Sequence, residues 1–136
     1  MTAPNNYNSD NFNLANWDYT PPVDSAGGTT GVATIIYNMS SYESPYFYNG
    51  PDRSMVFTAP VTGATTSGSY GARSELREMN TDGTKAAWHL SQGGTMTATL
   101  EVNSIPKFLD GTPGKVIIGQ IPVACNELCR LYYDNG

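Results

Sequence analysis

The sequence predicts an all-β protein, an antiparallel β-sandwich of short strands of the jelly-roll kind. Three observations favour this fold class. Gly, Ser, Thr, Asn and Tyr are abundant, whereas charged residues make up 14% of the 136 residues. Short apolar segments alternate with turn signals rich in Gly, Pro and Asn. No stretch has the periodicity of about 3.6 residues that marks an amphipathic helix.

The predicted strands follow one another along the chain, with turns between them. Residues 11–20 are expected to form a first strand or an anchoring arm, and Pro45 makes residues 42–49 an edge strand or a loop. Residues 95–102 alternate apolar and polar side chains most regularly, which is typical of a half-buried strand. The other expected strands are 32–37, 54–59, 73–79, 86–90, 116–121 and 128–133.

One domain is expected in a chain of this length. Residues 1–10 form a polar lead, and residues 11–136 form the predicted domain. The segment Asp134-Asn135-Gly136 is a hairpin-turn signal that no strand follows, so we expect a sandwich that is incomplete at its C-terminus. The N-terminus has neither the basic nor the apolar segment of a signal peptide, and no apolar run is long enough to span a bilayer.

The net charge of −5 disfavours nucleic acid and anionic membranes as partners. An acidic protein binds an acidic polymer only if its few cations are concentrated in one place. Three of the seven Lys and Arg residues, namely Arg53, Arg73 and Arg77, lie close together in the sequence. The composition therefore leaves an anionic polymer open as a ligand.

The two cysteines carry no predicted redox chemistry or metal site. Cys125 and Cys129 would be roughly 13 Å apart in an extended strand, beyond disulfide reach, although a tight turn would permit a bridge. The chain has a single histidine, His89, which we interpret as a surface or packing residue. Two cysteines and a distant histidine do not form a zinc site, so we expect free or buried thiols and no metal.

The segment Arg73-Ser74-Glu75-Leu76-Arg77 is the candidate site. In a strand, Arg73, Glu75 and Arg77 share one face, which we call the arginine row, while Ser74 and Leu76 share the other. Glu75 would be held between two guanidinium groups, whose remaining donors match an external carboxylate in bidentate geometry. The alternative is an exposed charge row that contributes little to stability.

This stretch, extended to Glu78-Met79, resembles the signature of the alginate lyases of polysaccharide lyase family seven. The resemblance runs from Phe12 onward and implies a jelly roll of two antiparallel sheets, with the substrate in the groove of the concave sheet. Further similar segments occur in the family's order: Asn16-Trp17, Pro22-Val23-Asp24, Met55-Val56-Phe57-Thr58-Ala59-Pro60, Gly63-Ala64-Thr65-Thr66, Val116-Ile117-Ile118-Gly119-Gln120-Ile121 and Leu131-Tyr132-Tyr133.

The resemblance implies β-elimination in a uronate polymer, with alginate as the substrate. Arg73 and Gln120 would neutralise the carboxylate beside the proton that a base removes. Glu75 would orient the arginines, and Arg77 would bind a neighbouring sugar or brace Glu75. We expect no cofactor, because Arg and Gln neutralise the carboxylate and no cluster with calcium-loop spacing is present. A secreted or periplasmic monomer is expected.

The chain departs from the family pattern in two places. The family's Gln-Ile-His reads Gln120-Ile121-Pro122 here, so the imidazole is absent. The chain also ends before the strand that carries the family's catalytic tyrosine, and Tyr132 and Tyr133 come too early to replace it. We therefore expect an inactive fragment of a lyase. The alternatives are a non-catalytic module that binds acidic polysaccharide, and a structural sandwich with a charged strand face.

Overall fold

The computed structural model describes residues 6–122 and 127–134 of the chain. Within these residues the secondary structure consists of six strands and the four-residue helix α1 (Asn8–Asn11), so the all-β prediction is confirmed. The jelly roll stays a prediction. The chain divides into two compact units, Met1–Lys85 and Ala86–Gly136, and each is described by itself.

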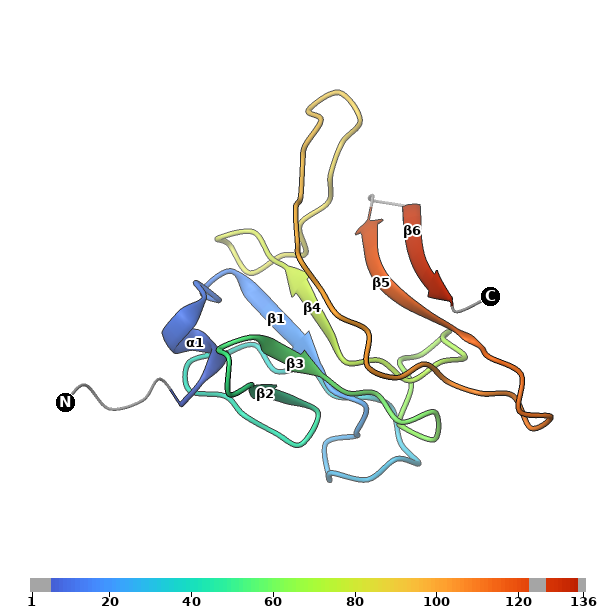
Figure 1. Cartoon of the computed structure of the whole chain (residues 1–136). Helices are drawn as coiled ribbons and strands as arrows, with labels where there is room; N and C mark the ends of the chain where they lie inside the picture. The colour runs from blue at the N-terminus through green and yellow to red at the C-terminus, as the bar shows by residue number, and fades with distance from the viewer. Residues whose placement is uncertain (1–5, 123–126, 135–136) are drawn as a thin grey trace. The chain divides into compact units, whose positions relative to one another are not determined.

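The first unit contains two antiparallel strand pairs, labelled in Figure 1. Strand β1 (Trp17–Thr20) pairs with β4 (Glu75–Glu78), and β2 (Phe47–Asn49) pairs with β3 (Met55–Phe57). All four strands are shorter than the segments expected from the sequence. Residues 32–37 do not form the predicted strand; they contribute single bridges, among them one from Ile36 to Tyr19.

The core of the first unit is built from aromatic and aliphatic side chains that come from separate segments. Tyr19 and Phe47 are fully buried, and their ring centroids lie 4.8 Å apart. Leu14 and Met39 complete the buried cluster, and Leu76 of β4 packs against it. Burial of such side chains is the main source of stability in a small unit. It also fixes which face of β4 points inward.

Helix α1 lies at the end of the predicted polar lead. The Asp10 side chain accepts hydrogen bonds from the backbone N–H groups of Asn6 and Tyr7, at 3.1 Å and 3.0 Å. These groups precede the helix, and a carboxylate in its first turn is favourable there. The Asn8 side chain is 1% exposed, so the end of the polar lead is packed against the unit.

The second unit contains one antiparallel pair, β5 (Lys115–Pro122) and β6 (Glu127–Asp134). The register shifts between Ile117 and Gly119, as in a β-bulge. At the start of β5, the Lys115 ammonium lies 5.9 Å from the centre of the Tyr132 ring. The predicted strands at 116–121 and 128–133 are therefore present, and both are longer than expected.

Two predicted strands of the second unit are absent. Residues 86–90 and 95–102 form no ladder, and Figure 1 draws this part of the chain as a long loop. Met96 and Leu100 are 73% and 49% exposed. An alternating pattern describes a strand only when a partner strand and a buried face are available, and the described residues offer 95–102 neither.

In the part of the chain that the structure describes, no helix has the length and apolar character needed to cross a membrane.

Candidate functional site

The arginine row lies on β4 and the residues just before it, on the face that is turned away from the core. Leu76 packs against the buried cluster, and the Ser74 hydroxyl lies 2.8 Å from both the Tyr19 hydroxyl and the Tyr46 carbonyl oxygen. Side chains alternate along a strand, so Arg73, Glu75 and Arg77 point to the opposite face. The inward contacts of Ser74 and Leu76 therefore hold the row in place.

Arg73 is held on two sides. Its Nη1 atom lies 2.8 Å from Glu75 Oε2, and its Nη2 atom lies 2.9 Å from Ser69 Oγ. The Arg73 and Glu75 side chains are 34% and 24% exposed, so the pair is reachable from solvent. A guanidinium has more N–H donors than these two bonds use. The Nε–H group of Arg73 is buried, so the other N–H groups on Nη1 and Nη2 are the ones that remain for a ligand. Ser69 had no signal in the sequence, because it precedes the strand in a Gly-rich segment.

Asp18 lies next to the arginine row, and no signal in the sequence pointed to this position. It lies directly opposite Arg77 in the ladder of β1 and β4, and residues opposite each other share a face. Asp18 is 3% exposed. Burial raises the pKa of its carboxyl, whereas the positive charges of Lys85 and Arg77 act to lower it and Glu75 acts to raise it. The alternation of residues 17–20 is the signal that could have placed Asp18 on the polar face of β1. It does not indicate which strand pairs with β1.

Gln120, the fourth predicted site residue, lies in the second unit. It is half-buried on β5 and lies opposite Arg130 of β6, so the two side chains share a face. Arg130 is exposed and was not singled out in the sequence. The structure thus brings three of the predicted residues together, Glu75 and Arg77 on β4 and Arg73 just before it, and it puts an amide beside a further cation on β5 and β6.

The position two residues after Gln120 is occupied by Pro122 at the end of β5. Pro122 lies opposite Glu127, next to a register shift, and its carbonyl oxygen accepts a hydrogen bond of 3.1 Å from the Trp88 backbone N–H. Proline has no N–H to donate, so its place at a strand end is the expected one. Cys125 lies outside the described residues, and Cys129 of β6 is a free, exposed thiol.

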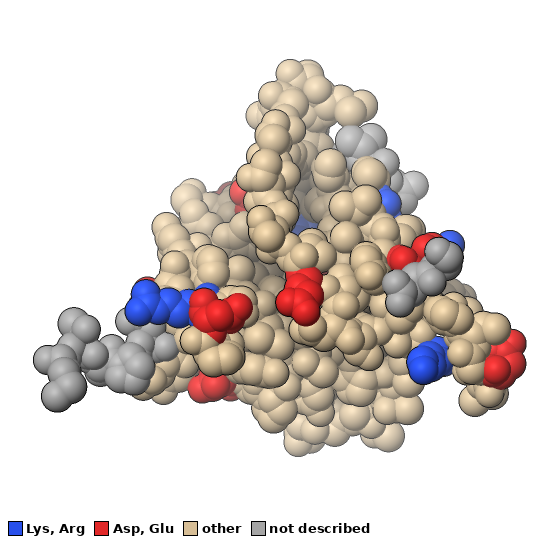
Figure 2. Space-filling view, viewed as in Figure 1, with Lys and Arg blue, Asp and Glu red and all other residues tan. Residues whose placement is uncertain are grey.

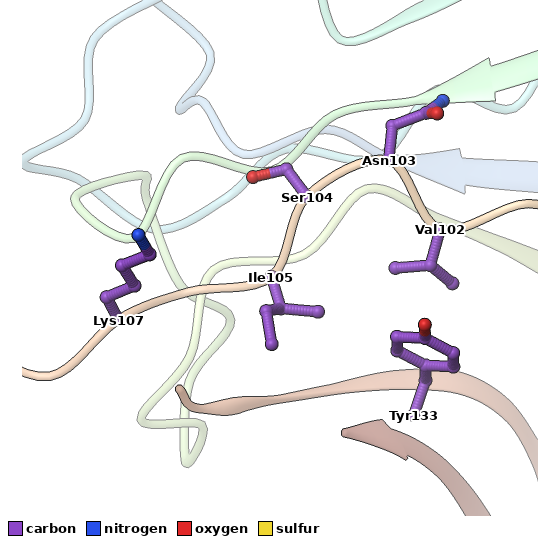
Figure 3. Close-up of a pocket in the computed structure, with 6 residues that line it drawn as sticks. All are labelled: Val102, Asn103, Ser104, Ile105, Lys107 and Tyr133. Atoms are coloured by element: carbon purple, nitrogen blue, oxygen red, sulfur yellow. The ribbon is translucent and has the colours of Figure 1, made fainter. Parts of the chain in front are cut away.

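A hollow of about 290 Å³ lies in the second unit between residues 102–107 and β6. Figure 3 shows the Val102 and Ile105 side chains directed toward the Tyr133 side of the hollow, whereas Ser104 and Lys107 point the other way. Its lining is therefore mixed, with apolar side chains on the Tyr133 side and polar residues elsewhere.

Two other residues considered in the sequence lie outside the arginine row. Arg53 is in the exposed turn between β2 and β3, with a positive φ of 66°. His89 is exposed in the loop before β5, where its carbonyl oxygen accepts a hydrogen bond from Gln92. Among residues 6–122 and 127–134, no group of three or more His, Cys, Asp or Glu side chains is arranged to hold a metal ion.

The charged side chains are sparse on the surface. On the face seen in Figure 2, Lys, Arg, Asp and Glu stand in small groups separated by wide uncharged areas. On this face, an anionic ligand would therefore meet small groups of charged side chains rather than an extended basic surface.

The fold and this site define an all-β protein with a row of alternating arginine and carboxylate side chains on one strand. The chain belongs to the alginate lyase family, whose sequence profile matches residues 12–136. It is 34% identical over 151 aligned residues to an alginate lyase of Klebsiella pneumoniae, and the alignment covers 91% of this chain and 48% of that protein. The chain thus spans about half the length of the curated relative that it matches.

Proposed function

We propose that this chain is the carboxylate-recognising part of a polyuronate lyase and that its ligand is alginate. The observation that carries the proposal is the arginine row, in which Glu75 of β4 holds the Arg73 guanidinium at 2.8 Å, within reach of solvent. A guanidinium oriented in this way is pre-organised for bidentate contact with a uronate carboxylate. Membership of the alginate lyase family supports the same substrate class.

The chemistry of such a lyase explains why these groups are needed. A base removes the proton beside the uronate carboxylate, the electron pair forms a carbon–carbon double bond, and the glycosidic oxygen at C4 leaves and takes up a proton. The proton is weakly acidic while the carboxylate is charged, so fixed hydrogen-bond donors must neutralise the carboxylate. We assign this role to Arg73 and Gln120. Arg77 binds a neighbouring uronate, and Glu75 orients both arginines.

The base is the missing part of the proposed machinery. Pro122 stands where the resemblance places an imidazole, and proline cannot accept a proton. We therefore propose that the chain binds alginate and cleaves it poorly. A substrate of this size is met outside the cytoplasm, so we propose a secreted or periplasmic protein that acts as a monomer.

A second candidate function is a non-catalytic module that binds acidic polysaccharide. Pro122 is the observation that favours it, because the arginine row is present while the imidazole is not. The two functions differ in what they predict for a histidine at position 122: a lyase should gain activity, whereas a binding module should not.

The binding proposal is tested with alginate oligosaccharides by isothermal titration calorimetry. Replacing Arg73→Gln should lower the affinity about tenfold or more, since a hydrogen bond to a charged group is worth about 1.5–3 kcal/mol. Arg53→Gln is the matched control, because it removes the same charge from an exposed turn outside the row. The affinity should also fall as salt is added. Equal affinity of the two variants would refute the role of the row.

The lyase proposal is tested by the ultraviolet absorbance of the unsaturated product. The unaltered chain should form little product. In a longer protein that adds the strand with the family's tyrosine, Pro122→His should form more, and the gain should be lost again when Arg73→Gln is added. A general base contributes about 10²–10⁴-fold in rate. Alginate binding with no product from any variant would favour the binding module. Rapid cleavage by the unaltered chain would refute the role given to position 122.

A further inference from the structure

We propose that Asp18 is a positioning residue, which fixes the Arg77 guanidinium in the arginine row from the neighbouring strand. The inference rests on the proposed function, because it explains how the second arginine of the row is presented to a uronate. No sequence motif pointed to this residue.

The ladder between β1 and β4 puts Asp18 in a position to do this. Asp18 lies directly opposite Arg77, and Tyr19 lies opposite Leu76. Tyr19 and Leu76 belong to the core side, so Asp18 and Arg77 lie on the side of the row. Arg73 thus has an ion pair with Glu75, two residues further along the chain, whereas Arg77 has the Asp18 carboxylate opposite it on the neighbouring strand.

Stability does not account for a carboxylate at position 18. The residue is 3% exposed, and burying a charge has a cost that a nearby opposite charge only offsets. An asparagine has nearly the same shape and would avoid that cost. The balance of charges agrees with this interpretation, since burial raises the pKa of Asp18 more than Lys85 and Arg77 lower it. The negative charge is therefore best explained by what it does to its cationic neighbour.

Three charged side chains, those of Lys85, Arg77 and Glu75, influence the ionisation of the Asp18 carboxyl. Arg77 is the direct cross-strand neighbour, and Lys85 is brought near by the bridge between Met79 and Lys85 after β4. Arg77 is half-buried, so its guanidinium has fewer orientations to choose from once a carboxylate holds it.

A positioning role and a mere charge effect predict opposite changes in affinity. By charge alone, a carboxylate beside a polyanion site weakens binding, so removing it should tighten binding. If Asp18 orients Arg77, removing the carboxylate should weaken binding despite the gain in positive charge. The sign of the change therefore separates the two roles.

The first experiment needs no substrate and observes Arg77 directly. The Arg77 Nε–H signal is followed by ¹⁵N nuclear magnetic resonance across the pH range in which the Asp18 carboxyl titrates, as located by its ¹³C signal. The Arg77 signal should shift with the same midpoint in the unaltered protein and should lose this transition in Asp18→Asn. Glu43→Gln, which neutralises an exposed carboxylate outside β1 and β4, should retain it.

An Arg77 signal that does not follow the titration of Asp18 in the unaltered protein would overturn the proposal. This arm does not depend on whether Asp18→Asn folds. It also stays decisive if the protein binds no acidic polysaccharide, an outcome that would refute the proposed function alone.

The second experiment measures the affinity for alginate oligosaccharides. Asp18→Asn should weaken binding about fivefold, the scale of a moderate coupling between neighbouring residues. Glu43→Gln should leave binding unchanged or slightly tighter. In the Arg77→Gln background, Asp18→Asn should cause no further loss, because its effect passes through Arg77. Tighter binding by Asp18→Asn, or an equal loss in both backgrounds, would refute the positioning role.

Discussion

The Tyr19 hydroxyl lies 2.8 Å from the Ser74 hydroxyl oxygen, which joins a fully buried ring of the first unit to the residue between Arg73 and Glu75. Ser74 Oγ also donates to the Tyr46 carbonyl oxygen, so Tyr19 is the group that donates to Ser74. Hydrogen bonds among Tyr19, Ser74 and the Tyr46 carbonyl group thus tie the segment of the arginine row to the aromatic core.

Removing this anchor should destabilise the first unit. Tyr19→Phe deletes one buried hydrogen bond and should lower the free energy of unfolding by about 1 kcal/mol. Tyr37→Phe is the control, because Tyr37 is 70% exposed and should change stability little. Urea denaturation followed by circular dichroism measures both. Equal midpoints for the two variants would show that the bond to Ser74 contributes nothing.

The same residue predicts a loss of stability at high pH. Burial of the phenol raises the pKa of Tyr19 from 10.0 to about 12. The folded state then keeps the proton that the unfolded state releases. The stabilisation is fully present below pH 10, falls as the pH rises toward about 12 and amounts to at most roughly 2–3 kcal/mol.

Thermal unfolding between roughly pH 9 and pH 12 tests whether stability falls as the pH rises, since this range spans the unfolded and folded pKa values of Tyr19. The unaltered protein should lose more stability over this range than Tyr19→Phe, which has no phenol at that position. If both lose the same amount, the decline comes from other groups and the shifted pKa is not its cause.

Glycine at position 63 is predicted to be necessary for the start of the arginine row, because a side chain does not fit there. A methyl group there would lie 2.7 Å from Pro22 Cβ and 2.9 Å from Ala72 Cβ, and Ala72 directly precedes Arg73. Gly63→Ala should therefore cost about 1–3 kcal/mol and weaken alginate binding. Gly71→Ala is the control, since a methyl group there would meet nothing within 4 Å.

These two glycine variants are compared by thermal unfolding and by calorimetry with alginate oligosaccharides. Gly71→Ala should be neutral or slightly stabilising, because alanine reduces the freedom of the unfolded chain. A Gly63→Ala protein as stable as Gly71→Ala would show that Pro22 and Ala72 move apart without cost.

Replacing Glu75→Gln should separate binding from stability. The ion pair with Arg73 is partly exposed, so its loss should change the free energy of unfolding by less than about 1 kcal/mol. Affinity for alginate oligosaccharides should nevertheless fall, because Arg73 loses its orientation. Glu43→Gln is the control for the lost negative charge. If Glu75→Gln bound as tightly as this control, Glu75 would have no orienting role.

Much of the fold class followed from local patterns. Residues 73–77 alternate charged and inward-facing side chains, and this alternation survives as the two faces around β4 because it depends only on strand geometry. Residues 95–102 show where the same reasoning was wrong. Their alternation is as regular, but no partner strand covers them within the described residues, so they stay exposed without a ladder.

The sequence by itself determined the all-β class, the segment that carries the arginine row and the proline that replaces an imidazole, since each of these is a property of neighbouring residues. Only the tertiary structure decided that Asp18 lies opposite Arg77 and that Ser69 holds Arg73. The physical reason is that the pairing and register of strands distant in sequence depend on which apolar faces can be buried together. In the first unit, the packing of Tyr19, Phe47 and Leu76 determines this pairing and register.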